Sequence, residues 1–463
     1  MDKFPRYYFL GIGGIGMSAL ARYFKTKGCD VAGYDLTQTK LTEDLKSEGI
    51  EVYYDDSIDK IPEKYRFAKK TLVVLTPAIP DNHPQLKYFH ENNYQILKRA
   101  EVLGQITRQS KGICIAGTHG KTTTSTIAAH LLYQSAVMCN AFLGGISNNY
   151  KTNLLLSNES NLVVIEADEY DRSFHHLLPY MAVITSADPD HLDIYKTPQA
   201  FRESFEYFTS LIRPGGALIM RKGIDVEPKL QNGVKLYTYS MDDGGDFCAE
   251  NIRSVPGEMH FDFVTPTEKI SDVRLGVPVR INIENSVAAM AIAWLNGVSK
   301  EELRVGISSY SGVYRRFNIV YKSDYVVYMD DYAHHPNELT ASITSIRELF
   351  GDKKITGIFQ PHLYSRTRDF AADFAEALSL LDELILLDIY PARELPIDGV
   401  DSMLIFKDVK LENKTMCTKE NLLSLLENKQ PEVLVTFGAG DIDIMVPLIK
   451  NQLKRIEKEN QNL

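Results

Sequence analysis

The stretch Gly117-Thr-His-Gly-Lys-Thr-Thr-Thr124 decides the fold of this chain, and it directly follows the apolar segment 113–116. A buried strand that turns through glycines into a helix points successive backbone N–H groups and the helix N-terminus into one concavity. Such a concavity binds phosphate, and Lys121 adds a positive charge for the β- and γ-phosphate oxygens. We therefore predict a nucleotide-phosphate loop formed by Gly117, Thr118, His119, Gly120, Lys121, Thr122 and Thr123.

This loop is shorter than the strict P-loop. The strict pattern has a glycine five positions before Gly120, where this chain has Ile115, so the motif reads GxxGKT. The alternative is a turn whose glycines and threonines only cap the following helix. The Gly-Lys-Thr-Thr-Thr run at a strand end favours phosphate binding, with the Thr122 hydroxyl as a ligand of Mg²⁺.

Acidic side chains follow two further apolar segments. Glu166, Asp168 and Glu169 come at the end of segment 162–167, and segment 181–186 is followed by Asp188, Asp190, His191 and Asp193. Ligands of open parallel sheets bind beyond the carboxyl ends of the strands, where a phosphoryl-transfer site also needs carboxylates for its metal. A histidine in a polar loop is more often simply solvated, but this one lies beside three aspartates. We predict a metal site at these strand ends, to which Thr122 of the phosphate loop can contribute; Glu166 and His191 are among the candidate ligands.

A second glycine motif opens the chain. Gly11, Gly13 and Gly16 follow an apolar segment at 7–10 in the pattern GxGxxG, and Asp35 ends the next apolar segment. This fingerprint indicates a backbone that closely approaches a pyrophosphate at a helix N-terminus. It leaves the nucleoside open, because a nicotinamide dinucleotide and a UDP-sugar both carry a diphosphate. A tight turn without a ligand is the further alternative.

The last third of the chain has two histidine-containing segments after apolar runs, 330–336 (DDYAHHP) and 360–368 (QPHLYSRTR). If the second segment opens a helix, His362 and Arg366 lie one turn apart on one face. Together they suit an anionic substrate or a developing phosphoryl charge. Helix capping and ordinary surface charge are the alternative.

Composition narrows the class of protein. The chain has 463 residues, with 51 basic and 61 acidic side chains and a net charge of −10. That balance disfavours nucleic acid or an anionic membrane as the main partner. Its five scattered cysteines form no CxxC pair, which argues against a disulfide framework and a cysteine zinc site. The N-terminal segment reaches glycine at residue 11, which is too early for the apolar core of a signal peptide. No apolar run approaches the 18 residues of a membrane span. We therefore expect a cytoplasmic protein.

Apolar segments alternate with helical patterns along the whole chain, which predicts an α/β protein with parallel sheets. We expect three domains: a Rossmann-like N-terminal domain, a P-loop-type central domain with a mostly parallel sheet, and a Rossmann-like C-terminal domain. Their expected bounds are 1–108, 109–311 and 312–463.

Taken in order, several motifs together resemble the Mur ligase family, whose members are ATP-dependent amide-bond ligases of cell-wall precursor synthesis. They are GTHGKTTT (117–124), EADE (166–169), DPDHLD (188–193), NxxN (282–285), RRF (315–317) and DDYAHHP (330–336). Within the family, the chain looks most like the members that join L-alanine to UDP-N-acetylmuramate. The members that attach a recycled murein tripeptide are the alternative, but they normally carry an insertion after EADEYD that this chain lacks.

The resemblance implies roles for matching positions. Lys121 looks like the phosphate-loop lysine, while Glu166 and His191 look like ligands of the metal, which is expected to be two Mg²⁺ ions. The third domain is expected to close over the site and exclude water. Positions matching groups at the adenine, the ATP phosphates and the ribose are Asn282, Asn285, Arg316 and Asp331. Positions matching the muramoyl and alanine end are His334, His362 and Arg366.

The expected partners are ATP, UDP-N-acetylmuramate and L-alanine, in a monomer or weak homodimer. Residues expected at the UDP-sugar are Gly11, Gly13, Gly14, Gly16, Asp35, Thr76, Gly145 and Asn148. The glycines of the 144–148 segment are equally well explained as ordinary loop residues without a ligand. The chain departs from many relatives at Ile281, where they have a histidine before the adenine helix, and at Glu206, where several carry a carbamylated lysine.

The implied reaction runs through an acyl phosphate, formed when the lactyl carboxylate attacks the γ-phosphate of ATP and consumed when the amine of L-alanine attacks the carbonyl. Two other classes remain as alternatives. An NAD-dependent oxidoreductase would use the first glycine motif, and a noncatalytic nucleotide-binding module would bind ATP without releasing phosphate. Neither alternative needs both glycine motifs together with the metal-ligand set.

Overall fold

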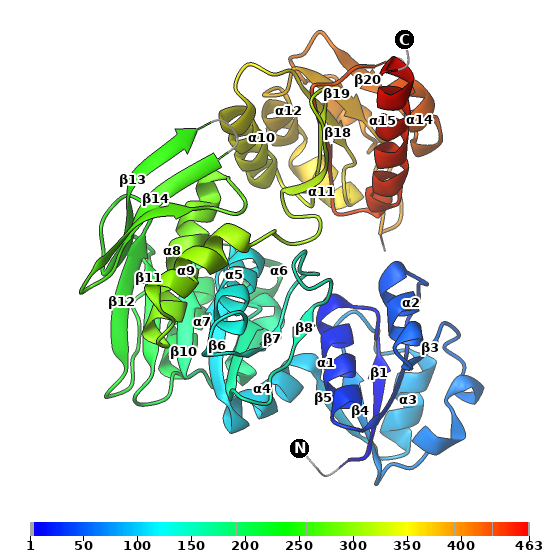
Figure 1. Ribbon diagram of the computed structural model, residues 1–463. Coiled ribbons are helices and arrows are strands. Elements are labelled where there is room, and N and C mark those ends of the chain that lie inside the picture. Colours follow the sequence, from blue (N-terminus) through cyan, green and yellow to red (C-terminus); the bar gives the residue numbers. More distant parts are fainter. Residues whose placement is uncertain (1–3, 190–191, 256–257, 393, 428, 462–463) are drawn as a thin grey trace. The chain divides into compact units, whose positions relative to one another are not determined.

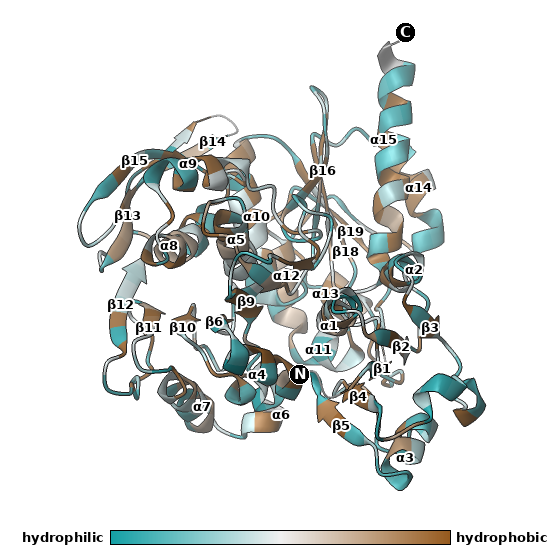
Figure 2. Cartoon of the chain, turned by 60° about the horizontal axis from the view of Figure 1, so that its bottom comes forward, coloured by the Kyte–Doolittle hydropathy of each residue, from teal (hydrophilic) through white to brown (hydrophobic). Residues whose placement is uncertain are grey.

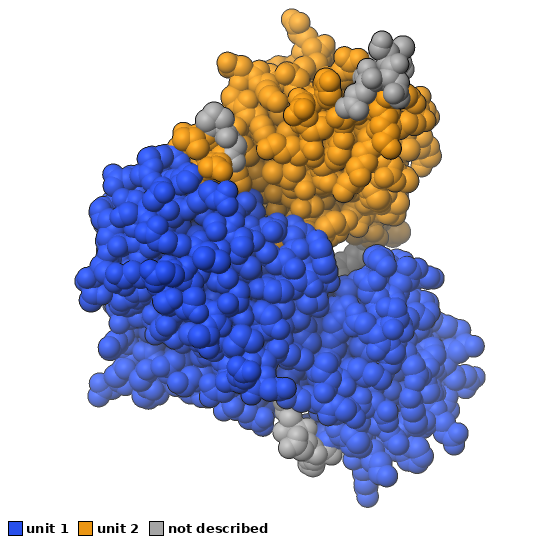
Figure 3. All heavy atoms as spheres, viewed as in Figure 1, with its two compact units in different colours: residues 1–253, 260–277, 282–311 blue, residues 254–259, 278–281, 312–463 orange. Residues whose placement is uncertain are grey.

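The computed structural model describes residues 4–189, 192–255, 258–392, 394–427 and 429–461 (Figure 1). It contains three sheets of five, ten and six strands, most of whose neighbouring strands run parallel. The predicted three-domain α/β fold is therefore confirmed. The chain divides into two compact units, shown in Figure 3: unit 1 has residues 1–253, 260–277 and 282–311, and unit 2 has residues 254–259, 278–281 and 312–463. The domain bounds at 108 and 311 stay predictions.

The first sheet of unit 1 has the order β3-β2-β1-β4-β5 and is wholly parallel. Its central strand is buried almost throughout, as expected for a strand covered on both faces. The strands are β1 (Arg6–Leu10), β2 (Asp30–Tyr34), β3 (Glu51–Tyr53), β4 (Thr71–Leu75) and β5 (Gln95–Lys98). The helices are α1 (Ile15–Thr26), α2 (Lys40–Ser47), α3 (Pro84–Glu91) and α4 (Arg99–Gln109), with short 3₁₀ turns η1 (Ile58–Lys60) and η2 (Glu63–Tyr65).

The second sheet of unit 1 has the order β15-β14-β13-β12-β11-β10-β6-β9-β7-β8. Its strands are β6 (Lys111–Ala116), β7 (Asn140–Phe142), β8 (Leu154–Leu155), β9 (Leu162–Glu166), β10 (Met181–Ile184), β11 (Ala217–Arg221), β12 (Lys235–Ser240), β13 (Phe247–Val255), β14 (Glu258–Val264) and β15 (Lys269–Arg274). The helical elements are α5 (Lys121–Tyr133), η3 (Tyr170–His176), α6 (Leu192–Tyr195), α7 (Pro198–Ser210), α8 (Arg280–Leu295) and α9 (Lys300–Ser309). Strand β6 lies between β9 and β10, so the turns after all three strands meet at one edge.

The two sheets of unit 1 are joined by a shared core and a polar network. Tyr23 of α1 packs its ring 5.4 Å from that of Phe142 in β7. The buried Asn153 accepts a hydrogen bond from Arg22 at 2.6 Å and donates to the Ile15 carbonyl at 2.6 Å. These contacts fix the first turn of α1 against the central sheet.

Unit 2 is built on a sheet of order β16-β17-β21-β18-β19-β20, in which only β16 runs antiparallel to its neighbour among the described pairs. Its strands are β16 (Asn318–Lys322), β17 (Val327–Asp331), β18 (Ile355–Phe359), β19 (Glu383–Leu386), β20 (Lys414–Met416) and β21 (Val433–Phe437). The helices are α10 (Pro336–Phe350), α11 (Tyr364–Asp369), α12 (Ala371–Leu378), α13 (Met403–Phe406), α14 (Lys419–Glu427), η4 (Asp441–Ile444) and α15 (Met445–Gln461).

Helix α15 packs Val446, Ile449 and Leu453 into one core of unit 2 and is otherwise mostly hydrophilic, as Figure 2 shows. Helix α15 is therefore amphipathic, with one apolar face in the core and a polar remainder. Among the described residues, no helix combines the length and apolar character that a membrane span requires.

Candidate active site

The predicted phosphate loop connects β6 to α5. Gly117 has φ +139° and Gly120 has φ +81°, a backbone region that favours glycine. A Cβ at Gly117 would lie 2.1 Å from the Thr185 hydroxyl oxygen, so a side chain there would also collide with the end of β10. Gly120 is the N-cap of α5 and offers no side-chain cap, which leaves the first backbone N–H groups of this helix available to an anion.

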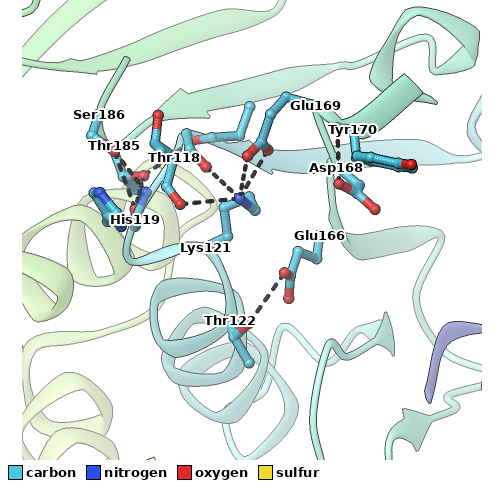
Figure 4. A network of polar contacts seen from close by, with 12 residues as sticks. Thr118, His119, Lys121, Thr122, Glu166, Asp168, Glu169, Tyr170, Thr185 and Ser186 are labelled. Carbon is cyan, nitrogen blue, oxygen red and sulfur yellow. Dashed lines mark hydrogen bonds and ion pairs between the residues drawn. The ribbon is translucent and has the colours of Figure 1, made fainter. Parts of the chain in front are cut away.

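Hydrogen bonds from the neighbouring strand end hold the loop in shape (Figure 4). The backbone N–H of His119 donates to the Ser186 hydroxyl at 2.8 Å, and the Thr185 hydroxyl donates to the His119 carbonyl at 2.5 Å. The Thr118 hydroxyl donates to the Asp188 carbonyl at 2.7 Å. The loop is therefore preorganised by β10 and the residues that follow it.

Lys121, the first residue of α5, points back across the loop. Its Nζ lies 2.9 and 2.8 Å from the two carboxylate oxygens of Glu169 and donates to the Gly117 carbonyl at 2.5 Å. Burial alone lowers the pKa of Lys121, but the charges of Glu169, Glu166 and Asp168 outweigh it and raise that pKa. Burial also raises the pKa of Glu169, and the charge of Lys121 opposes this effect. The lysine is thus a buried cation at the mouth of the loop.

Thr122 and Glu166 form the polar pair beside this cation, and Figure 4 shows them facing each other. The Thr122 hydroxyl donates to Oε1 of Glu166 at 3.1 Å. The other oxygen, Oε2, is buried without a hydrogen-bond partner among the described residues. A Cβ at Gly144 would lie 1.8 Å from this Oε2, so glycine is needed where the 144–148 loop passes the carboxylate.

This donor set fits a magnesium ion. Mg²⁺ prefers oxygen ligands, and it commonly takes one or two carboxylates together with water and substrate phosphates. The buried, unsatisfied Oε2 of Glu166 beside a threonine hydroxyl supplies that start of a coordination shell. No cluster of three or more His, Cys, Asp or Glu side chains suited to a metal occurs in the described part of the chain. The predicted ligand His191 lies outside the described residues.

The predicted adenine residues lie on α8, next to the phosphate loop. The Thr124 hydroxyl of α5 donates to Oδ1 of Asn285 at 3.2 Å, and a Cβ at Gly120 would lie 2.8 Å from the same oxygen. Asn285 in turn donates to Asn282 Oδ1 at 3.4 Å. Thr123 lies in the first turn of α5. The structure therefore brings both asparagines to the N-terminal end of α5.

The first glycine motif sits where β1 turns into α1. Gly11 has φ +86°, and a Cβ there would lie 2.4 Å from Cγ2 of Thr76, so these two predicted residues are in contact. The N–H of Gly13 donates to Oδ2 of Asp35 at 2.7 Å. Gly14 is the N-cap of α1, which has no side-chain cap and no acidic residue in its first turn. A predicted second anion site is thus assembled from Gly11, Gly13, Gly14, Gly16, Asp35 and Thr76.

Asn148 contacts the segment that leads out of unit 1, and its role at the UDP-sugar stays a prediction. Its side-chain amide donates to the Ser311 carbonyl at 3.0 Å, at the end of unit 1. The next residue, Asn149, donates to the Ser309 carbonyl at 2.8 Å and accepts from the Ser311 N–H at 2.8 Å. The loop that carries Gly145 and Asn148 therefore holds the segment that leads out of unit 1.

In unit 2, the predicted residues lie at or after the ends of β17 and β18, except Arg316, which precedes β16. Arg316 places its guanidinium 5.2 Å from the ring centre of Tyr332. Asp331 accepts a hydrogen bond from Ser342 at 2.5 Å, and burial raises the pKa of this carboxyl. Rings of His334 and His362 lie 6.0 Å apart. Burial lowers the pKa of His334; the charge of Glu338 opposes this, and the charges of Arg366 and Arg316 add to it.

The predicted helical turn between His362 and Arg366 is wrong. Helix α11 begins only at Tyr364, because Leu363 has φ +74° and cannot continue a right-handed helix backward. His362 instead forms an isolated β-bridge with Tyr390. Nη1 of Arg366 is buried without a hydrogen-bond partner among the described residues, and such a nitrogen is suited to an anionic ligand.

The roles of three residues that matter to this geometry were not predicted from the sequence. Glu169, one of several carboxylates after β9, is the partner of Lys121. Arg315 is buried against Asp330 at 3.3 Å, so the first arginine of the RRF motif is structural. Arg99, at the start of α4, contacts Asp168 at 3.1 Å. For Glu169, the one sequence signal was its position directly after a strand. The ion-pair partners of Arg315 and Arg99 depend on how the chain folds, so the sequence carried no signal for them.

Three models of the Mur ligase family match the chain. The model described as "Mur ligase family, catalytic domain" matches residues 6–111, "Mur ligase middle domain" matches 115–293, and "Mur ligase, glutamate ligase domain" matches 315–440. Together they cover most of the sequence.

Curated relatives align along nearly the full length. A UDP-N-acetylmuramate--L-alanine ligase of Parabacteroides distasonis is 60% identical over 459 residues, which is 99% of each chain. One of Phocaeicola vulgatus is 59% identical and covers 97% of this chain and 98% of the relative. Among solved structures, the UDP-N-acetylmuramate-alanine ligase of Thermotoga maritima superposes with a TM-score of 0.82 at 26% identity, over 98% of this chain and 99% of that one. A murein peptide ligase of Psychrobacter arcticus shares the fold, with a TM-score of 0.67 at 20% identity over 97% of this chain and 98% of that one.

Proposed function

The chain belongs to the Mur ligase family, and we propose that it joins L-alanine to the lactyl carboxylate of UDP-N-acetylmuramate at the expense of ATP. The product would be a peptidoglycan precursor, with ADP and phosphate released. The observation that carries the proposal is the buried Lys121 beside Glu169 and Glu166. It lies at the start of α5, a helix whose N-terminal N–H groups have no side-chain cap. Relatives at 56–60% identity, all named L-alanine ligases, support L-alanine as the amino acid.

The first step has to bring a carboxylate to a triphosphate, which repels it. In the proposed arrangement the loop amides and Lys121 bind the β- and γ-phosphates and spread the negative charge. Thr122 and Glu166 would hold Mg²⁺, which supplies further charge neutralisation at the phosphate oxygens when bound. The lactyl carboxylate then attacks the γ-phosphorus, the bond to ADP breaks, and an acyl phosphate forms.

Glu169 has a positioning role in this scheme. It holds the Lys121 ammonium over the loop through two short contacts and stabilises its charged form. A bound triphosphate would compete with Glu169 for the same cation, so the lysine is already charged and aimed when ATP arrives. Such preorganisation reduces the rearrangement needed at the moment of reaction.

In the second step, the amino group of L-alanine attacks the acyl carbon, and phosphate leaves with one former carboxylate oxygen. We propose that the residues after β17 and β18, His334, His362 and Arg366, serve the amino-acid end, and that Arg316 and Asp331 serve the nucleotide. The buried and unpartnered Nη1 of Arg366 supports an anionic ligand there. His191 stays a predicted second metal ligand, and the monomer or weak dimer stays a prediction.

Phosphate release tests the proposal. The purified chain should release phosphate with MgATP and UDP-N-acetylmuramate only when an amino acid is added, with L-alanine preferred over glycine, L-serine and the murein tripeptide. Preference for the tripeptide would assign the recycling reaction instead. Lys121→Ala should abolish release while its far-UV circular dichroism at the assay temperature remains that of the native chain, although the uncompensated Glu169 should lower its melting temperature. Near-normal turnover would show that the phosphate-loop assignment is wrong.

A further inference from the structure

Arg99 lies against the first glycine motif. A Cβ at Gly16 would be 2.6 Å from Nη1 and 3.3 Å from Cζ of Arg99, so the guanidinium crosses the first turn of α1 where only glycine leaves room. The third glycine of this motif usually serves close packing of helix and strand. Here it also gives an arginine access to the end of α1, whose first turn has no acidic side chain.

The guanidinium of Arg99 makes few hydrogen bonds within the described part of the chain. Nη2 donates to Oδ2 of Asp168 at 3.1 Å, and Asp168 is the hydrogen-bond partner found for it among the described residues. The side chain of Arg99 is 22% exposed and that of Asp168 is 38% exposed, and partly exposed ion pairs of this kind are weak. A guanidinium has five N–H donors in a planar fork, so most of this binding capacity is left for an anion.

The position of Arg99 is unfavourable for the helix that carries it. It is the first residue of α4, and a cation there opposes the helix dipole. Its neighbour Lys98 is turned elsewhere and pairs with Asp171 at 2.7 Å. The two adjacent cations therefore have different surroundings. Lys98 pairs with Asp171, whereas Arg99 lies between Asp168 and the glycine motif.

We propose that Arg99 is a positioning residue that binds the diphosphate of the nucleotide-sugar substrate at the first turn of α1. The inference rests on the proposed function, which places a UDP-sugar at this motif. The amides of the Gly11–Gly16 turn would hold one side of the diphosphate, and the free edge of the guanidinium would hold the other. Asp168 contacts Nη2, so Nη1, the guanidinium nitrogen nearest Gly16, stays available to the diphosphate.

The test is direct binding of UDP, measured by isothermal titration calorimetry on the full chain. Arg99→Ala should weaken UDP binding about ten- to a hundredfold, the range expected for one hydrogen-bonded charge. Arg99→Lys should recover part of the loss. The KM for UDP-N-acetylmuramate should rise by the same factor, with a much smaller change in kcat, because the contact is made equally in ground and transition states.

Lys98→Ala is the matched control. It removes a cation from the adjacent position and breaks the ion pair with Asp171, three residues after the Asp168 that Arg99 contacts. It should leave UDP affinity within about twofold of the native value. MgADP affinity should stay unchanged in both variants, because Lys121 and Glu169 are untouched. Equal losses in Lys98→Ala and Arg99→Ala, or a parallel loss of MgADP binding in Arg99→Ala, would show a purely structural role and overturn the inference.

The inference and the proposed function can fail separately. If Arg99→Ala binds UDP like the native chain while the native chain still ligates L-alanine, only the inference is wrong. If the native chain binds UDP through Arg99 but releases no phosphate with its proposed substrates, the ligase proposal fails and the role of Arg99 at a diphosphate stands. A raised KM with unchanged UDP binding would place Arg99 at the sugar or its carboxylate and contradict the diphosphate assignment.

Discussion

Replacing Arg315 should destabilise unit 2 strongly, whereas replacing the adjacent Arg316 should hardly affect stability. The Arg315 side chain is 10% exposed, and its Nε lies 3.3 Å from Asp330, which is fully buried. Its other nitrogens donate to the carbonyls of Gly438 at 2.5 Å and Gly440 at 3.3 Å. Arg316 instead lies over the Tyr332 ring at 5.2 Å.

The expected magnitudes follow from these contacts. Removing one partner of a buried ion pair costs about 3–5 kcal/mol, because the other charge stays buried without compensation. For a domain of this size, 1 kcal/mol shifts the melting temperature by about 2–4 °C, so Arg315→Ala should lower it by roughly 6–20 °C. Loss of the cation–π contact in Arg316→Ala is worth about 0.5–1 kcal/mol.

The destabilisation should depend on pH. Burial raises the pKa of Asp330 to about 6 even though Arg315 opposes the shift. A folded-state pKa above the unfolded value means that stability from this carboxyl falls as pH rises through that range. Without Arg315 the pKa of Asp330 rises further, so Arg315→Ala should be less damaging at pH 5, where Asp330 can be protonated, than at pH 8.

Two spectroscopic probes distinguish the units. Trp294 is the only tryptophan of the chain and lies in unit 1, so its fluorescence follows that unit, whereas far-UV circular dichroism follows both. Arg315→Ala should show an early circular-dichroism transition ahead of the Trp294 transition. Arg316→Ala should melt like the native chain yet lose about a hundredfold or more in kcat if it acts on the phosphates. Native-like melting of Arg315→Ala, or equal destabilisation by both variants, would refute this reasoning.

Three further predictions concern unit 1. Burial lowers the pKa of His130 to about 4, below its unfolded value. The unfolded state therefore binds a proton first, and lowering the pH from 7 to 5 should cost about 2 kcal/mol of stability through this group. In His130→Gln the melting temperature should fall less over the same pH range than in the native chain. Gly144→Ala should displace Glu166, since its Cβ would lie 1.8 Å from Oε2, and should raise the Mg²⁺ concentration needed for half-maximal phosphate release while native-like melting is kept. Asn153→Ala should cost about 2–3 kcal/mol in denaturant unfolding, because it leaves the Ile15 carbonyl and the Arg22 guanidinium each without one hydrogen bond; a cost near zero would show that this network is not needed.

Much of the fold was predictable because the strands are short apolar runs ended by glycine, proline or acid. The apolar segment 162–167 matches β9 to within one residue, and segment 181–186 contains the whole of β10. The strands β12 to β15 were not predicted, since they are not continuous apolar runs: β13 is mostly exposed over its second half, and most residues of β15 are exposed. Such strands follow from pairing with their neighbours, which no single segment encodes.

The site was predictable where chemistry depends on local sequence. The turns at Gly11 and Gly120 both have the left-handed backbone for which glycine is the favoured residue. Partner choice was not predictable: neither Glu169 as the partner of Lys121 nor Arg99 at Gly16 follows from spacing, because the elements meet only in the folded sheet. The wrong helical turn at His362 has a local cause, the left-handed backbone at Leu363, which the sequence does not reveal.

The most direct test of the account follows an oxygen atom. UDP-N-acetylmuramate labelled with ¹⁸O in its lactyl carboxylate would be turned over with MgATP and L-alanine, and the released phosphate examined by ³¹P nuclear magnetic resonance. If the loop around Lys121 activates that carboxylate as an acyl phosphate, each phosphate released carries one ¹⁸O. Unlabelled phosphate from a reaction that still forms the amide would contradict the central claim.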